Sequence, residues 1–199
     1  YDWQQRRLNP QLMNDEQNSY TKFGDLGAPH LVKIAVTFKP HENEGYAAKV
    51  QTPNGWQKGC DFPSVNVKVS GLKHEYTYIG ASSGVRKSFQ NFPFDTIVKV
   101  RSSDGSAASW WSGKRSFLGE PIFVPRGGSI QEASHPSFVE DDGYLLCIQY
   151  DVAEQVCYLL VLDAQRLGGM DTLVAKLKVP KQLSFPIGFH GFWDETLDM

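Results

Sequence analysis

The chain has 199 residues and a formal net charge of -2, from 20 Lys and Arg against 22 Asp and Glu. This length is enough for a sizeable core, and the balanced charge predicts no broad basic face, so we expect no nucleic-acid partner. Aromatic residues make up 13% of the chain, and 18 Gly and 11 Pro interrupt it often, which favours many short strands over long helices. We therefore expect an all-β fold.

The predicted elements begin after an irregular lead-in. Residues 1–30 are rich in Asn, Gln and Asp and carry neither an initiator Met nor a targeting pattern, so we expect the natural amino terminus to lie upstream. Residues 31–199 form the predicted β domain. Alternation and β-branched content predict strands within 31–38, 46–52, 61–66, 74–82, 96–102, 107–112, 121–127, 144–151, 157–164 and 173–180.

Turn residues punctuate these strands. Pro53, Asn54 and Gly55 predict one turn, and Ser103, Asp104 and Gly105 predict a tight hairpin. The last four predicted strands follow one another in series. Groups of about four short antiparallel strands are the unit of a β-propeller, but a β-sandwich would show a similar strand count. Strand spacing alone leaves both architectures open.

Residues with reactive side chains are scattered along the chain. No two of the five histidines lie three to five residues apart, as zinc ligands on a helix would. The sequence has no H-E-x-x-H, no G-x-S-x-G, no phosphate-binding glycine loop and no EF-hand loop. Cys60, Cys147 and Cys157 are odd in number and lack C-x-x-C spacing. We expect Cys147 and Cys157 to be small apolar residues within strands, with a disulfide between them as the less favoured alternative.

Two acidic stretches are candidates for chemistry. In EDDGY, residues 140–144, we favour a turn at Asp142 with Glu140 and Asp141 solvated beside it over a metal site. Glu120 directly precedes the apolar stretch PIFV and would be drawn inward with it. A buried carboxylate needs a partner such as a histidine N–H, although a plain turn residue is the alternative.

His190 lies in FPIGFHGFW, residues 185–193. One interpretation is a ring that closes a buried loop, packed against Phe189 and Phe192. The other is a functional role for the ring, although a lone histidine is more often structural.

Several stretches together resemble one family. They are DFPSVN, YTYIGASSG, FPFDTIVKV, GEPIFVPR, EDDGYLLCIQYD, YLLVLDA, VAKLKVP and FPIGFHGFW, within residues 61–193. They occur here in the same order as in the carboxy-terminal part of the carotenoid cleavage oxygenases. FPFDTIVKV and FPIGFHGFW look most like the plant plastid members that act in strigolactone synthesis.

This resemblance implies a seven-bladed β-propeller, of which the chain would supply the carboxy-terminal blades. It also implies a non-haem Fe(II) on the propeller axis, bound by four histidines. His190 matches one of these ligands, and Glu120 matches a carboxylate that accepts a hydrogen bond from a ligand's second nitrogen. Asp61 occupies another such carboxylate position, where the family commonly has Glu. His74 and His135 fall at non-ligand positions and are expected at the surface, with the other three ligands expected upstream of this chain.

The activity implied is cleavage of a carotenoid double bond by O2, and it would belong to the complete parent protein and not to this chain alone. The plant resemblance narrows this to the 9′,10′ bond of 9-cis-β-carotene in the plastid, giving 9-cis-β-apo-10′-carotenal and β-ionone. Collecting such a substrate from a lipid phase implies peripheral membrane contact through an apolar patch. The alternatives are a catalytically silent propeller fragment or binding module that lacks the other iron ligands and, less favoured, retinoid isomerase chemistry on the same scaffold.

Overall fold

The structure is a computed structural model that describes residues 31–37, 47–51, 58–83, 92–126, 133–183, 185 and 190–194. Apart from one 3-10 turn, η1 (Val67–Val69), the regular elements of these residues are strands, as the composition predicted. The strands are β1 (Lys33–Thr37), β2 (Ala47–Gln51), β3 (Cys60–Ser64), β4 (Tyr76–Ala81), β5 (Thr96–Arg101), β6 (Ala107–Trp111), β7 (Ser116–Leu118), β8 (Ile122–Pro125), β9 (Gly143–Asp151), β10 (Val156–Asp163) and β11 (Leu173–Lys178). Within the described ranges, no helix has the length and apolar character needed to cross a bilayer. The predicted lead-in, the turn at Pro53, and both His30 and His41 lie outside the described residues.

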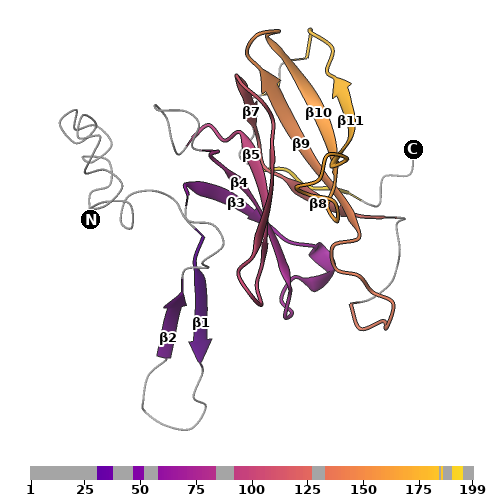
Figure 1. Cartoon of the computed structure of the whole chain (residues 1–199). Helices are drawn as coiled ribbons and strands as arrows, with labels where there is room; N and C mark the ends of the chain where they lie inside the picture. The colour runs from indigo at the N-terminus through magenta and orange to yellow at the C-terminus, as the bar shows by residue number, and fades with distance from the viewer. Residues whose placement is uncertain are drawn as a thin grey trace, which may run out of the picture.

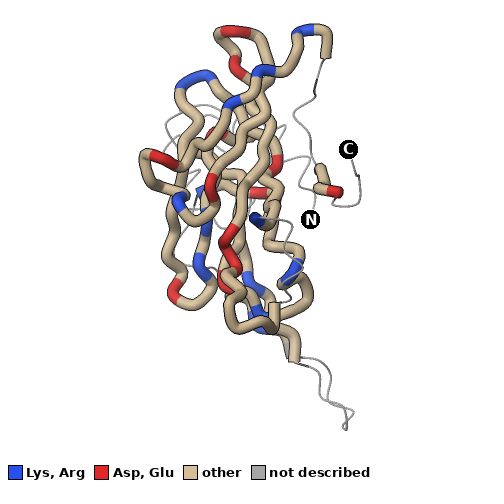
Figure 2. The backbone as a smooth tube through the Cα atoms, turned by 90° about the vertical axis from the view of Figure 1, so that its right-hand side faces the viewer, with Lys and Arg blue, Asp and Glu red and all other residues tan. Residues whose placement is uncertain are grey.

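The strands form three antiparallel sheets. β1 pairs with β2, and β3, β4, β5 and β6 form a four-stranded sheet in chain order. The five-stranded sheet has the order β11, β10, β9, β7, and β8 also pairs with β9. Figure 1 shows the β1–β2 hairpin set apart from the two larger sheets. Lys and Arg are interspersed with Asp and Glu along the described chain (Figure 2).

The main core lies between the two larger sheets. Successive residues of a strand point to opposite faces, so every second residue of β9 is buried from Gly143 to Gln149. Tyr78 and Ile97 come from the four-stranded sheet and pack in one cluster with Leu118, Phe123, Leu145 and Leu160 of the other. Full burial of such a side chain stabilises the fold by roughly 1.5–3 kcal/mol.

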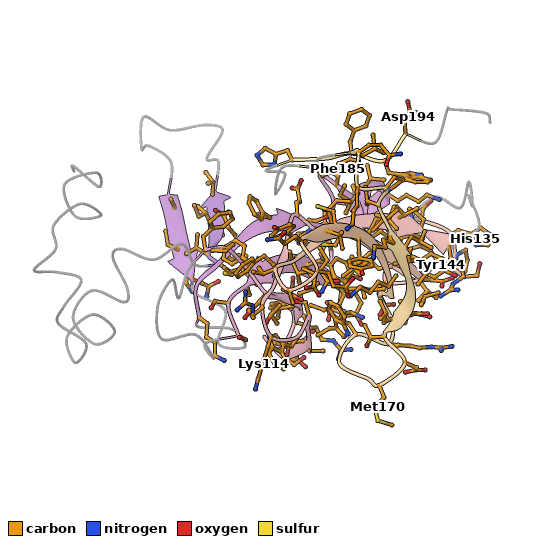
Figure 3. The ribbon with its side chains drawn as sticks, turned by 90° about the horizontal axis from the view of Figure 1, so that it is seen from above. Lys114, His135, Tyr144, Met170, Phe185 and Asp194 are labelled. Carbon is orange, nitrogen blue, oxygen red and sulfur yellow. The ribbon has the colours of Figure 1, made fainter. Side chains whose placement is uncertain are left out.

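The four strands predicted in series are present as β8, β9, β10 and β11. The predicted hairpin joins β5 to β6, where Gly105 has φ +70° and its N–H donates to the Arg101 carbonyl at 2.9 Å. The three-residue strand β7 was not predicted, because Ser116–Leu118 is too short to show an alternation. Met170, in the connection between β10 and β11, extends away from the fold on the side opposite to Phe185 and Asp194 (Figure 3).

The acidic stretch before β9 is structural, but its carboxylates are not solvated as we expected. The Glu140 carboxylate accepts the backbone N–H groups of Glu75 and Tyr76 at 2.7 to 2.9 Å. Asp141 accepts from the Lys99 ammonium at 2.5 Å, and Lys99 also donates to the Ala164 carbonyl at 3.0 Å. This stretch therefore ties the four-stranded sheet to the five-stranded one.

All three cysteines are free thiols. Cys60 and Cys147 are buried, and Cys157 is half-buried. Burial raises the pKa of Cys60 to about 11 and that of Cys147 to about 12, so both stay protonated at neutral pH. Cys147 of β9 and Cys157 of β10 lie within strands as predicted, and the alternative of a disulfide between them is not formed.

Candidate metal centre

Glu120 lies in the short connection between β7 and β8, two strands that both pair with β9. The preceding residue, Gly119, makes two hydrogen bonds to β9. Gly119 donates its N–H to the Ile148 carbonyl at 2.9 Å, and the Cys147 thiol donates to the Gly119 carbonyl at 3.3 Å. The Glu120 side chain is 15% exposed, so this fixed backbone turns its carboxylate inward, as the apolar PIFV stretch predicted.

The Glu120 carboxylate contacts two groups of one dipeptide. Its Oε2 accepts the Gly191 N–H at 2.8 Å, and its Oε1 lies 3.4 Å from Nδ1 of His190. The backbone hydrogen bond is the stronger of the two, since the ring contact is longer than an ordinary N–H···O bond. The structure thus brings together Glu120 and His190, which are 70 residues apart in the chain. An Nδ1–H that donates to Glu120 leaves Nε2 unprotonated, with a lone pair for a metal ion.

Gly191 is needed for this approach. A Cβ at this position would lie 2.7 Å from Cδ1 of Ile122, a separation that side chains do not tolerate. Glycine therefore lets the segment come close to β8.

In this chain, which resembles only the carboxy-terminal part of a family of longer proteins, the segment around His190 is exposed. The His190 side chain is 81% exposed, and Phe192 and Trp193 are exposed at 85% and 52%. Phe189 lies outside the described residues.

The aromatic ring that does contact His190 is Phe62 of β3. The two ring centroids are 6.2 Å apart and the planes are nearly perpendicular, at 84°. Phe62 has φ +56°, where β3 shifts register against β4, and a bulky residue in this region costs about 1–3 kcal/mol. Phe62 was not predicted as part of the site, because a positive φ at phenylalanine has no local sequence signal.

Asp61 lies beside Phe62 but does not meet the other two predicted site residues. Its side chain is exposed, and its Oδ1 accepts the Phe62 N–H at 2.8 Å. Within the described part of the chain, Asp61 makes no hydrogen bond to Glu120 or His190.

The remaining described histidines have local partners. Nε2 of His74 lies 3.4 Å from the Thr77 hydroxyl, and this side chain is half-buried and not fully at the surface. Nδ1 of His135 lies 2.8 Å from the Ser137 hydroxyl, and His135 is exposed as expected. Among the described residues, no group of three or more His, Cys, Asp and Glu could hold a metal ion. The donors present therefore fit one arm of a histidine metal centre, with one imidazole and its supporting carboxylate.

Comparisons with known proteins identify the family of this chain. Residues 2–195 match the family described as RPE65, retinal pigment epithelial membrane protein. The chain is 42% identical to carotenoid cleavage dioxygenase 7, chloroplastic, of Arabidopsis thaliana over 97% of its length, and 30% identical to apocarotenoid-15,15'-oxygenase of Synechocystis over 94%. It spans 29% and 34% of the length of these two relatives.

Solved structures show the same architecture. A chimera of the Synechocystis apocarotenoid oxygenase and RPE65 superposes with a TM-score of 0.59 at 30% identity, covering 75% of this chain and 28% of the chimera. The cobalt-substituted Synechocystis enzyme gives 0.55 at 32% identity, covering 67% and 25%. The antiparallel sheets are therefore blades of a β-propeller and not a sandwich. The chain belongs to the carotenoid cleavage oxygenase family, whose relatives include enzymes named carotenoid cleavage dioxygenases.

Proposed function

We propose that the chain is part of a non-haem iron(II) dioxygenase that uses O2 to cleave a carotenoid double bond into two carbonyl products. The observation that carries the proposal is the carboxylate of Glu120 facing Nδ1 of His190 while holding the Gly191 N–H. A carboxylate on one nitrogen of a histidine is the usual support for a metal bound at the other. Family membership and the cobalt-substituted relative support the same chemistry.

Each residue has a distinct role in this proposal. His190 supplies one neutral imidazole, a ligand that suits Fe(II). Glu120 fixes the tautomer and raises the basicity of that ring, and Asp61 does the same for a second ligand histidine from the parent protein. Bound iron would supply the positions at which O2 is activated.

The finer proposal concerns substrate and compartment. Identity of 42% and 38% to the chloroplastic carotenoid cleavage dioxygenases 7 of Arabidopsis thaliana and rice supports a plastid enzyme of strigolactone synthesis. Its substrate would be 9-cis-β-carotene, cut at the 9′,10′ bond to 9-cis-β-apo-10′-carotenal and β-ionone.

The test is made on the complete parent protein, with iron per chain and products from 9-cis-β-carotene under air as readouts. We expect one iron and two cleavage products from the wild type, and loss of both in His190→Ala. His135→Ala is the matched control, since His135 bonds only locally to Ser137 among the described residues. A wild-type protein with neither iron nor cleavage would instead be the catalytically silent propeller module.

A further inference from the structure

Phe62 has a backbone conformation that phenylalanine rarely adopts. It lies at φ +56°, at the point where the pairing of β3 with β4 shifts between Asp61 and Ser64. Pro63 follows it and disfavours a right-handed helical backbone for the residue before it. A bulge of this kind changes the direction of a side chain relative to a regular strand.

Two neighbours maintain this conformation. The Asp61 carboxylate accepts the Phe62 N–H at 2.8 Å, which offsets part of the cost of the left-handed backbone. Gly80, opposite Asp61 on β4, leaves room for the Phe94 ring on which Phe62 packs, because a Cβ there would lie 3.1 Å from Phe94, although it would make only ordinary contact with Phe62, at 3.5 Å. The Phe62 ring is consequently only 6% exposed and packs edge-on against Phe94, with centroids 5.6 Å apart.

The same ring is linked to Glu120 through the junction of the two sheets. Phe94 forms a bridge with Leu118, whose N–H donates to the Phe94 carbonyl at 2.8 Å. Leu118 stands two residues before Glu120 in the chain. Phe62 therefore contacts His190 from the four-stranded sheet, and Glu120 contacts it from the five-stranded sheet.

We propose that Phe62 is a positioning residue for His190, which sets the plane of the imidazole while Glu120 holds its Nδ1. One contact of 3.4 Å at Nδ1 leaves the ring able to tilt, and an edge-to-face neighbour at 6.2 Å restricts that tilt. His190 stays 81% exposed, so the contact buries little of it and its main effect is on direction. This inference rests on the proposed function, because a fixed ring plane is useful only if Nε2 binds a metal ion.

The experiment compares Phe62→Leu with Phe123→Leu in the complete parent protein. Both replace a buried phenylalanine, and Phe123 is 5% exposed and stacks on Tyr78, with centroids 5.4 Å apart. We expect both variants to lose similar thermal stability. Only Phe62→Leu should release iron to a chelator faster, by about tenfold, and Phe62→Tyr should release it at the wild-type rate.

A second readout needs no metal. In the metal-free protein, Phe62→Leu should move the His190 ring proton resonances, assigned by their loss in His190→Asn, and leave those of His135 unchanged. Equal iron release by the two leucine variants, with unmoved His190 resonances, would overturn the positioning role. A wild type that retains no iron would contradict the proposed function instead, while a His190 shift in Phe62→Leu would still support the ring contact.

Discussion

Two carboxylate pairs of the described chain differ in exposure: Lys99–Asp141 joins the two larger sheets, and Glu120–His190 joins the five-stranded sheet to the terminal segment. Lys99 and Asp141 have side chains 10% and 14% exposed, and the Ala164 carbonyl completes the lysine's partners. Glu120 is equally inward at 15%, but its partner His190 is 81% exposed. A pair closed on all sides contributes to fold specificity, whereas a carboxylate that holds an exposed imidazole leaves a ring nitrogen available for chemistry. Substitutions at the two pairs distinguish a role in the fold from a role in metal binding.

The largest expected effect is at the closed pair. Lys99→Met leaves Asp141 buried without its cation, which should lower the free energy of unfolding by about 3–5 kcal/mol. The double variant Lys99→Met with Asp141→Leu should recover most of the loss, because it removes the uncompensated charge. Chemical denaturation measures both. A single variant no less stable than wild type would mean that this pair does not hold the sheets together.

At the open pair, Glu120→Gln should act on the metal more than on the fold. Its amide oxygen can still accept the Gly191 N–H, but the negative charge beside His190 is lost. We expect metal affinity in the parent protein to fall roughly 10- to 100-fold, with little change in thermal unfolding. Wild-type affinity in this variant would remove Glu120 from the proposed centre.

A smaller effect is expected at Gly191. Gly191→Ala places a Cβ against Cδ1 of Ile122, and the segment can move away, so we expect a loss of about 1 kcal/mol in stability together with weaker metal retention. Ile122→Val removes Cδ1 and should restore metal retention in the double variant. Additive effects of the two substitutions would show that the close approach is not what positions the segment.

The smallest effect is a dependence on pH. Burial raises the pKa of Cys147 to about 12 from an ordinary value of 9.0, so the folded state holds the thiol proton more tightly than the unfolded state. This contribution to stability is fully present below pH 9.0 and is lost as the pH rises towards about 12. Cys147→Ala should therefore show a shallower fall in unfolding free energy across this window, measured by urea titration. If the fall of unfolding free energy with pH is the same in Cys147→Ala, another group causes the loss of stability at alkaline pH. Buried Cys60 would be the next residue to replace.

Much of the fold was predictable because its signals are local. Apolar stretches bounded by turn signals identified strands such as β9 and β10, and the turn at Ser103, Asp104 and Gly105 identified the hairpin between β5 and β6. β7 was missed because three residues carry too little pattern. Glu140 and Asp141 were expected in solvent because a turn is usually solvated, and the opposite sheet that buries them is distant in sequence.

The sequence by itself determined the strand character of the chain, its turns, its family and the burial of the Glu120 side chain. These follow from side-chain alternation, backbone preferences and ordered motifs, all of which act over a few residues. Only the tertiary structure decided that Glu120 holds the dipeptide at 190–191, that Phe62 turns towards the imidazole, and that His190 stands open. The physical reason is that these contacts join the terminal segment to strands distant from it in sequence, and their geometry depends on how the sheets pack and on a left-handed backbone that local preference opposes.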